Sequence, residues 1–227
     1  MNGLARAMRA AVHTAPPAFS WASVPSQLLR INGLEGSIAG SGGVLTGVTD
    51  VSGAGQTISL TGSPFYSAAD AGLNGAPSFW VDAATRVTAS GVSRSNARYV
   101  AYVGYKPTTG HAYLWDGSAA GPSAHHVYIL SNNTVGSHSA SGVLSGASAI
   151  GRKRLLAAFD GTTQTLLNGA GSITSGIGLA SGSGLIFGSA VDTSLSGMRC
   201  AFFMACSAVP SAPIRAAIEA KLIGDFG

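Results

Sequence analysis

The sequence predicts an all-β protein: an antiparallel sandwich of two sheets, with a short N-terminal helical arm and a C-terminal helix. Two observations favour sheets. Residues 155–159 end at Asp160-Gly161 and residues 163–167 end at Asn168-Gly169. Such turn pairs are strong hairpin signals because their residues tolerate positive φ, so an antiparallel meander is expected here. The apolar run 196–206 is then long enough to be a core strand.

Length and composition favour one large domain. The chain has 227 residues, which is enough to bury a substantial core in a single all-β unit. We expect an arm over residues 1–23 and the sandwich over residues 24–227. Only 10% of residues are charged and 32 are glycine, so Ser, Thr, Asn and Gly must supply most of the surface.

The charge pattern argues against nucleic acid and membranes as partners. The formal charge of +4 comes from 13 basic and 9 acidic residues, and the basic residues are too scattered to form one phosphate-binding stripe. No apolar run approaches the roughly 20 residues that span a bilayer, and the N-terminus has no continuous apolar signal segment.

The two cysteines are expected to be free and buried. Cys200 and Cys206 lie six residues apart on one predicted strand, which separates them by about 20 Å. A disulfide needs Cα atoms within roughly 7 Å. Unpaired thiols favour folding in a reducing cytoplasm.

The chain begins with a predicted helix over residues 2–13, because Leu4 and Met8 share one face and helix-favouring residues are dense. Pro16-Pro17 ends it and leaves an extended segment. This arm is either an unpacked terminus or a docking element for another subunit. The residues expected to dock are Leu4, Arg6, Met8, Arg9, Phe19 and Trp21.

The remaining elements are mostly strands separated by Gly-rich and Ser-rich turns. In residues 78–82, two-residue alternation predicts that Phe79 and Val81 are core and that Trp80 is on the other face. Residues 36–43 are expected to form a loop. The predicted strands are 26–34, 44–50, 56–60, 78–82, 98–106, 111–115, 126–130, 155–159, 163–167, 185–188 and 196–206, with 134–149 as weak strand and loop.

The spacing of apolar residues changes from a strand period to a helix period near the end of the sequence. Ile214, Ile218, Leu222 and Phe226 recur every four residues, and Ser211 is a suitable N-cap. A helix over residues 210–226 is therefore expected to lay one apolar stripe across the sandwich.

The order of these pieces resembles the laminin-G-like, concanavalin A-like jelly-roll domains common in extracellular and phage structural proteins. The resemblance covers roughly residues 24–227 and implies a jelly-roll sandwich, but one such fold hosts many functions. The matching motifs are residues 50–55 (D-x-S-G-x-G), 72–82 (G-x-N-G-x-P), 158–161, 167–169, 185–188, 196–197 and the closing helix 215–227.

Catalytic and metal sites are not expected. Glycoside cleavage needs two carboxyl groups about 5 to 10 Å apart, but Glu35 and Glu219 are the only glutamates. Asp82 and Asp116 could pair across strands, although Asp serves turns more often. His125 and His126 point to opposite faces of a strand and cannot share one metal. No catalytic residue, metal ligand or cofactor is therefore assigned.

Aromatic residues near loops are the remaining site candidates. Flat rings can stack on sugars or on another subunit, and nearby polar side chains can add hydrogen bonds. The alternative is that most of these rings pack within the sandwich, which is favoured for Trp115 and Tyr128. The candidate contacts are Trp80, Tyr113, Trp115, Asp116, Asn132 and Asn133.

These observations favour a non-enzymatic virion structural protein, of the phage head-decoration, spike or tail-fibre type. The jelly roll would be exposed on the particle and adhere to host-surface glycans, while the arm docks to capsid or tail proteins. A virion assembled in the host cytoplasm accounts for a family usually found outside cells, the free thiols and the low-charge surface. The chain is also a candidate homo-oligomer. The alternatives are a stand-alone carbohydrate-binding module and, third, a glycoside hydrolase or lyase.

Overall fold

The computed structural model describes residues 19–227 apart from residue 83 and the segments 93–95, 106–111, 117–124, 130–133, 140–141, 149–153, 160–163, 168–171, 176–184 and 188–197. In strands β9–β12, β14 and β15 only the course of the backbone is described.

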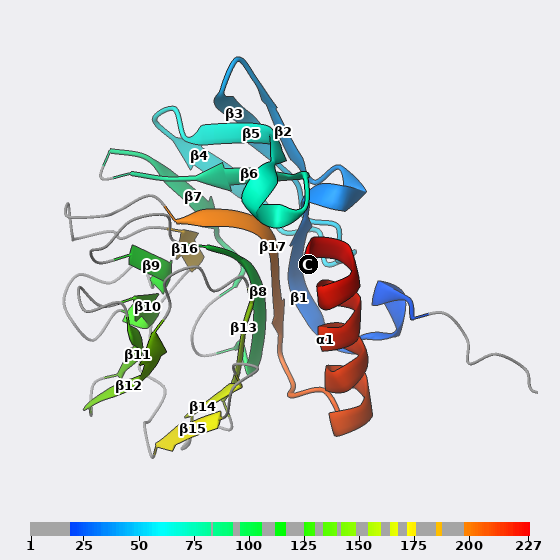
Figure 1. Ribbon diagram of the computed structural model, residues 1–227, viewed down its shortest axis with the longest axis vertical. Helices are drawn as coiled ribbons and strands as arrows, with labels where there is room; N and C mark the ends of the chain where they lie inside the picture. Colours follow the sequence, from blue (N-terminus) through cyan, green and yellow to red (C-terminus); the bar gives the residue numbers. More distant parts are fainter. Residues whose placement is uncertain are drawn as a thin grey trace, which may run out of the picture.

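The described strands form two antiparallel sheets (Figure 1). The larger sheet runs β15-β14-β13-β8-β17-β6-β5-β3-β2, with β1 beside β17. Its strands are β1 (Gln27–Asn32), β2 (Ile38–Ser41), β3 (Val44–Val48), β5 (Phe65–Asp70), β6 (Ala76–Trp80), β8 (Tyr99–Tyr105), β13 (Arg154–Phe159), β14 (Gln164–Leu167), β15 (Ser172–Ser175) and β17 (Arg199–Cys206).

The smaller sheet runs β12-β11-β10-β9-β16-β7-β4. Its strands are β4 (Ile58–Thr61), β7 (Arg86–Ala89), β9 (Ala112–Asp116), β10 (His125–Ile129), β11 (Thr134–Ser139), β12 (Gly142–Ser148) and β16 (Leu185–Phe187). Three short 3-10 helices, η1 (Trp21–Ser23), η2 (Gly33–Glu35) and η3 (Ala71–Leu73), and one long helix, α1 (Ala212–Phe226), complete the described elements. This is the predicted two-sheet antiparallel sandwich with a C-terminal helix.

Strand β17 is a central strand of the larger sheet and has paired strands on both sides. It pairs with β8 along its length, from Arg199 opposite Tyr105 to Cys206 opposite Tyr99. On its other side, residues 202–206 pair with β1, and Cys200 pairs with Phe79 of β6. The last described strand in chain order therefore joins the first strand to the middle of the sheet.

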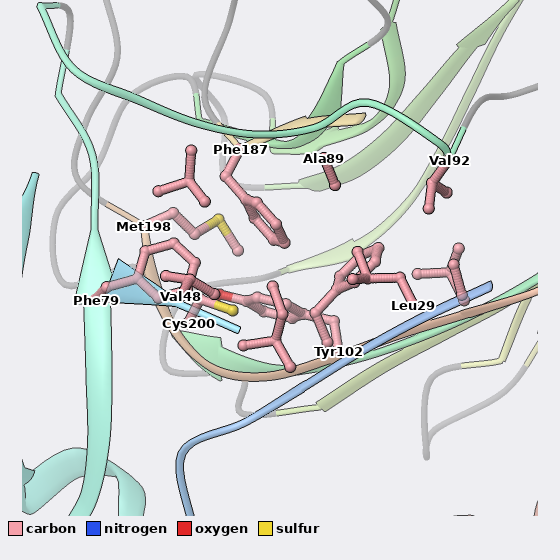
Figure 2. Close-up of a cluster of buried hydrophobic side chains, with 14 of the residues drawn as sticks. Leu29, Val48, Phe79, Ala89, Val92, Tyr102, Phe187, Met198 and Cys200 are labelled. Carbon is pink, nitrogen blue, oxygen red and sulfur yellow. The ribbon is translucent and has the colours of Figure 1, made fainter. Parts of the chain in front are cut away.

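The main core lies between the two sheets (Figure 2). Phe187 from the smaller sheet packs edge to face against Phe79 and Phe203 of the larger sheet, with ring centroids 5.3 and 5.0 Å away. Phe79 and Val81 are both buried, as the alternation predicts. Tyr102 is in the same core, and burial raises the pKa of its hydroxyl.

A second apolar layer covers the outer face of the larger sheet, where helix α1 lies against β17 and β1 (Figure 1). Ile218, Leu222 and Phe226 are fully buried there and Ile214 is partly buried, which confirms the predicted stripe. Ser211 precedes the helix, but its side chain makes no capping hydrogen bond.

Residues 19–23, which the sequence assigned to the N-terminal arm, pack against the sandwich. Trp21, expected to dock to another subunit, is buried against Phe202 with ring centroids 4.9 Å apart, and Phe19 packs edge-on against Trp21 at 4.9 Å. Gln27 donates side-chain hydrogen bonds to the carbonyls of Trp21 and Val24. Residues 19–23 therefore belong to the packed structure. The predicted helix and its docking residues Leu4, Arg6, Met8 and Arg9 lie outside the described residues.

Four of the described strands occur where none was predicted. The segment expected to be a loop, residues 36–43, contains β2, and β5, β7 and β15 fill stretches to which no strand was assigned. Cys200 and Cys206, by contrast, are both free and buried as expected.

Candidate functional site

One row of side chains crosses the outer face of the larger sheet, beyond the end of helix α1. The strand register aligns it: Tyr105 lies opposite Arg199, Trp80 opposite Phe65, and Phe65 opposite Val44. Arg199 adjoins Trp80 because Cys200 pairs with Phe79. We call these five residues (Val44, Phe65, Trp80, Arg199 and Tyr105) the outer-face row.

Trp80 stands between an aromatic ring and a cation. The Phe65 ring is stacked on it, with centroids 5.2 Å apart and planes 8° from parallel. The guanidinium carbon of Arg199 lies 3.4 Å from the centroid of its ring. Because β5 and β17 flank β6 on opposite sides, these contacts cover both faces of the indole. The flat-face stacking on a sugar that the sequence suggested for Trp80 is not available in this arrangement, and the indole presents its edge.

The row leaves apolar surface open to solvent next to Trp80. Phe65 is 38% exposed and Val44 is 42% exposed, and the two face each other across β3 and β5. Exposed large apolar side chains are unremarkable singly, but adjacent ones beside a cation form a surface suited to ligand contact.

Asp70 is the polar centre beneath the row. Its side chain is 5% exposed, and Oδ1 accepts hydrogen bonds from the backbone of Gly72 and the hydroxyl of Tyr105, both at 3.0 Å. Oδ2 accepts from the hydroxyl of Ser78 at 2.7 Å. Burial and the hydrogen bond to Asp70 both raise the pKa of Tyr105, so this residue remains a neutral donor at physiological pH.

The side chain of Arg199 makes no hydrogen bond to the residues that the structure describes. Among them, its nearest carboxylate oxygen is Oδ2 of Asp70, 3.9 Å from Nη1, which is an ion-pair distance and too long for a hydrogen bond. Its Nε is buried and has no partner in this part of the chain. The side chain is 23% exposed. A positioned guanidinium with unused donors can bind an anion.

Three of the other predicted contact residues belong to the smaller sheet. Tyr113, Trp115 and Asp116 are in β9 of the smaller sheet, where Asp116 lies opposite His125 and Ile186. Trp80 belongs to the larger sheet, so the predicted set is divided between two layers. Asn132 and Asn133 lie outside the described residues. A contact role for these residues stays a prediction.

The aspartates of the motifs hold loops together. Asp50 accepts hydrogen bonds from the backbone amides of Arg30, Ser52 and Gln56. Asp82 accepts from the amide of Ala84 and the hydroxyl of Thr85. These are the turn roles that the sequence favoured for Asp82. Within the described ranges, no cluster of three or more metal-binding side chains occurs.

The sequence reasoning missed four residues of the row: Val44, Phe65, Tyr105 and Arg199. A signal was present for Arg199, since a cation at the start of an apolar core strand is uncommon and calls for a partner. Phe65 could not be placed because its strand was not recognised.

The comparisons with known proteins bear on the fold. No family model and no curated protein matches the chain. The binding domain of a paraclostridial mosquitocidal protein superposes with a TM-score of 0.60 at 8% identity, over 89% of this chain and 52% of that chain. A second structure comes from a study of botulinum neurotoxin type C, whose cell entry is described as dependent on interaction with two ganglioside molecules. It superposes with a TM-score of 0.58 at 12% identity, over 87% of this chain and 51% of that chain. The chain thus spans about half the length of these structures.

A third structure matches over nearly all of its own length. Domain 4 of an extracellular arabinanase from Geobacillus stearothermophilus, in complex with arabinotriose, gives a TM-score of 0.54 at 11% identity over 85% of this chain and 97% of that domain. In the described parts of the chain, no helix is both long and apolar enough to cross a membrane. The similarity to these domains shows that the chain adopts a two-sheet jelly-roll sandwich fold.

Proposed function

We propose that the chain is a non-enzymatic jelly-roll module that binds glycans through the outer-face row. The observation that carries the proposal is the exposed Phe65, which stacks on one face of Trp80, while the other face holds the guanidinium of Arg199. That guanidinium makes no hydrogen bond to the residues that the structure describes. The fold supports it, since the similar structures include a domain in complex with arabinotriose and a neurotoxin whose cell entry depends on gangliosides.

The chemistry of the row suits a sugar. One side of a pyranose or furanose ring carries C–H groups that pack on apolar surface, while its hydroxyls need directional donors and acceptors. Phe65 and Val44 supply the apolar surface, and Arg199 supplies donors a short distance along the row.

A glycan array with single variants tests this proposal. Phe65→Ala and Val44→Ser should each weaken binding, and the matched control Ile223→Ser, at an apolar residue of α1 that is 45% exposed, should not. A loss with Trp115→Ala but none with Phe65→Ala would move the site to the smaller sheet. An array without any hit for the wild-type chain would contradict glycan binding.

The absence of hydrolysis is part of the proposal. Asp50, Asp70 and Asp82 each accept hydrogen bonds from loops or neighbouring side chains, which is a structural role. Prolonged incubation with every glycan that binds should release no reducing ends. Release that disappears in Asp82→Asn or Asp116→Asn would establish an enzyme instead.

We further propose the virion as the setting, with residues 1–18 docking to capsid or tail proteins. The low-charge surface and the two buried free thiols support assembly in a host cytoplasm followed by exposure outside it. A chain that begins at Phe19 keeps the packed Trp21, so it isolates the arm from the fold. It should be missing from sedimented particles that incorporate the full chain. Equal incorporation would contradict docking by the arm.

A further inference from the structure

We infer that Arg199 makes the outer-face row selective for glycans that carry a carboxylate, such as uronic or sialic acids. The inference rests on the proposed glycan binding and adds the chemical class of the ligand. It is carried by three features of the described residues: the unused donors of Arg199, the 3.9 Å that separates them from the Asp70 carboxylate, and the flat stacking on Trp80.

The first feature is the state of the guanidinium donors. An arginine side chain has five N–H donors, and none of those of Arg199 makes a hydrogen bond to the part of the chain that the structure describes. A buried donor without a partner is uncommon in native proteins and calls for an explanation, and Nε of Arg199 is such a donor among the described residues. A ligand that accepts from them is such an explanation.

The second feature is that the carboxylate of Asp70 lies too far away to accept from Arg199. Its two oxygens accept three hydrogen bonds, from Gly72, Tyr105 and Ser78. At 3.9 Å from Nη1, Oδ2 balances part of the arginine charge without accepting a hydrogen bond from it. A ligand carboxylate can bind Arg199 while Asp70 keeps all of its own partners.

The third feature is the orientation of the guanidinium. The guanidinium carbon of Arg199 lies 3.4 Å from the centroid of the Trp80 ring. At this distance the guanidinium must lie flat on the indole, where a cation–π contact holds it. The N–H bonds then point in the plane of the group and away from the ring. Such a fixed fork matches the two oxygens of a carboxylate, and Lys cannot reproduce it.

The neighbouring residues place a sugar beside that carboxylate. Phe65 lies on the far side of Trp80 from Arg199, and Val44 continues the row. A sugar packed over the exposed edges of Phe65 and Trp80 would direct a ring carboxylate toward Arg199. Because Asp70 already offsets part of the arginine charge, a singly charged carboxylate fits this place better than a doubly charged phosphate.

The test compares glycans that differ only in one carboxylate. Binding of 3′-sialyllactose and lactose, and of tri-galacturonate and its methyl ester, is measured by calorimetry on the full chain and on Arg199→Lys and Arg199→Gln. Melting temperatures of both variants establish that they fold. For whichever pair binds, we expect the acidic member to bind the wild-type chain more tightly and to lose about tenfold in affinity in Arg199→Lys.

The outcomes separate this inference from glycan binding itself. Equal binding of the acidic and neutral members, or no effect of either Arg199 variant, would overturn carboxylate selection and leave the proposed function standing. Failure of every glycan to bind would remove both. Binding of poly-glutamate without any glycan would show that the row recognises an acidic peptide, which also overturns the inference.

Discussion

Trp21 and Phe202 pack with ring centroids 4.9 Å apart, so a residue just after the undescribed N-terminal segment is part of the layer beneath helix α1. A chain beginning at Val24 should therefore be less stable than one beginning at Phe19. Removal of a buried Trp costs about 3 to 5 kcal/mol. Chemical denaturation of the two truncations and of the full chain measures this difference. Equal stability of the two truncations would show that Trp21 contributes nothing to the fold.

Acid should remove the stabilising contribution of Asp50. Burial acts to raise the pKa of Asp50, but hydrogen bonds from Ser52, Arg30 and Gln56 outweigh it and hold the pKa below its ordinary value. A lowered folded-state pKa means that the contribution is complete above the unfolded pKa of about 3.9 and is lost as pH falls through the folded value. Melting temperatures from pH 7 to pH 2 should show Asp50→Asn destabilised at neutral pH, with the difference from wild type shrinking below about pH 4. A difference independent of pH would contradict this assignment.

Gly33 cannot carry a side chain. A Cβ at Gly33 would lie 2.4 Å from the backbone oxygen of Pro77, so Gly33→Ala must displace the backbone of β6. We expect a loss of about 2 to 3 kcal/mol in the free energy of unfolding. Gly47→Ala is the matched control because nothing lies within 4 Å of its added Cβ. If the two variants are equally stable, Gly33 does not set the distance between η2 and β6.

The two thiols should react only when the chain unfolds. Burial raises the pKa of Cys206 to about 12 and raises that of Cys200 as well, so the reactive thiolate is scarce at neutral pH. A maleimide should label neither cysteine in native protein and both in denaturant, as counted by mass spectrometry. Rapid labelling of the native chain would contradict the burial of both residues.

Locally encoded elements were predictable from the sequence. The pairing of β13 with β14 was expected from the turn residues, and the two strands pair from Leu156 opposite Leu167 to Phe159 opposite Gln164. Helix α1 was expected from a four-residue period that its buried residues follow. In both cases the signal lies within one short segment.

Elements that depend on distant partners were not predictable. Strand β5 contains Ser and Ala, which have weak β-preference, and it forms because β3 and β6 offer it backbone partners. Trp80 was correctly assigned to the face opposite Phe79, but its neighbours come from β5 and β17, which only the sheet order brings together. Trp21 looked like part of a free arm because nothing near it in sequence reveals that Phe202 will cover it.

The position of β17 has a consequence for how the protein is made. This strand is the last described one to leave the ribosome, yet β1, β6 and β8 all pair with it. Until it emerges, those three strands expose edges that should be paired, and the contacts that close the larger sheet span almost the whole chain. Long-range pairing of this kind slows folding. The larger sheet should therefore close only once β17 has emerged, and the nascent chain would need protection from aggregation until then.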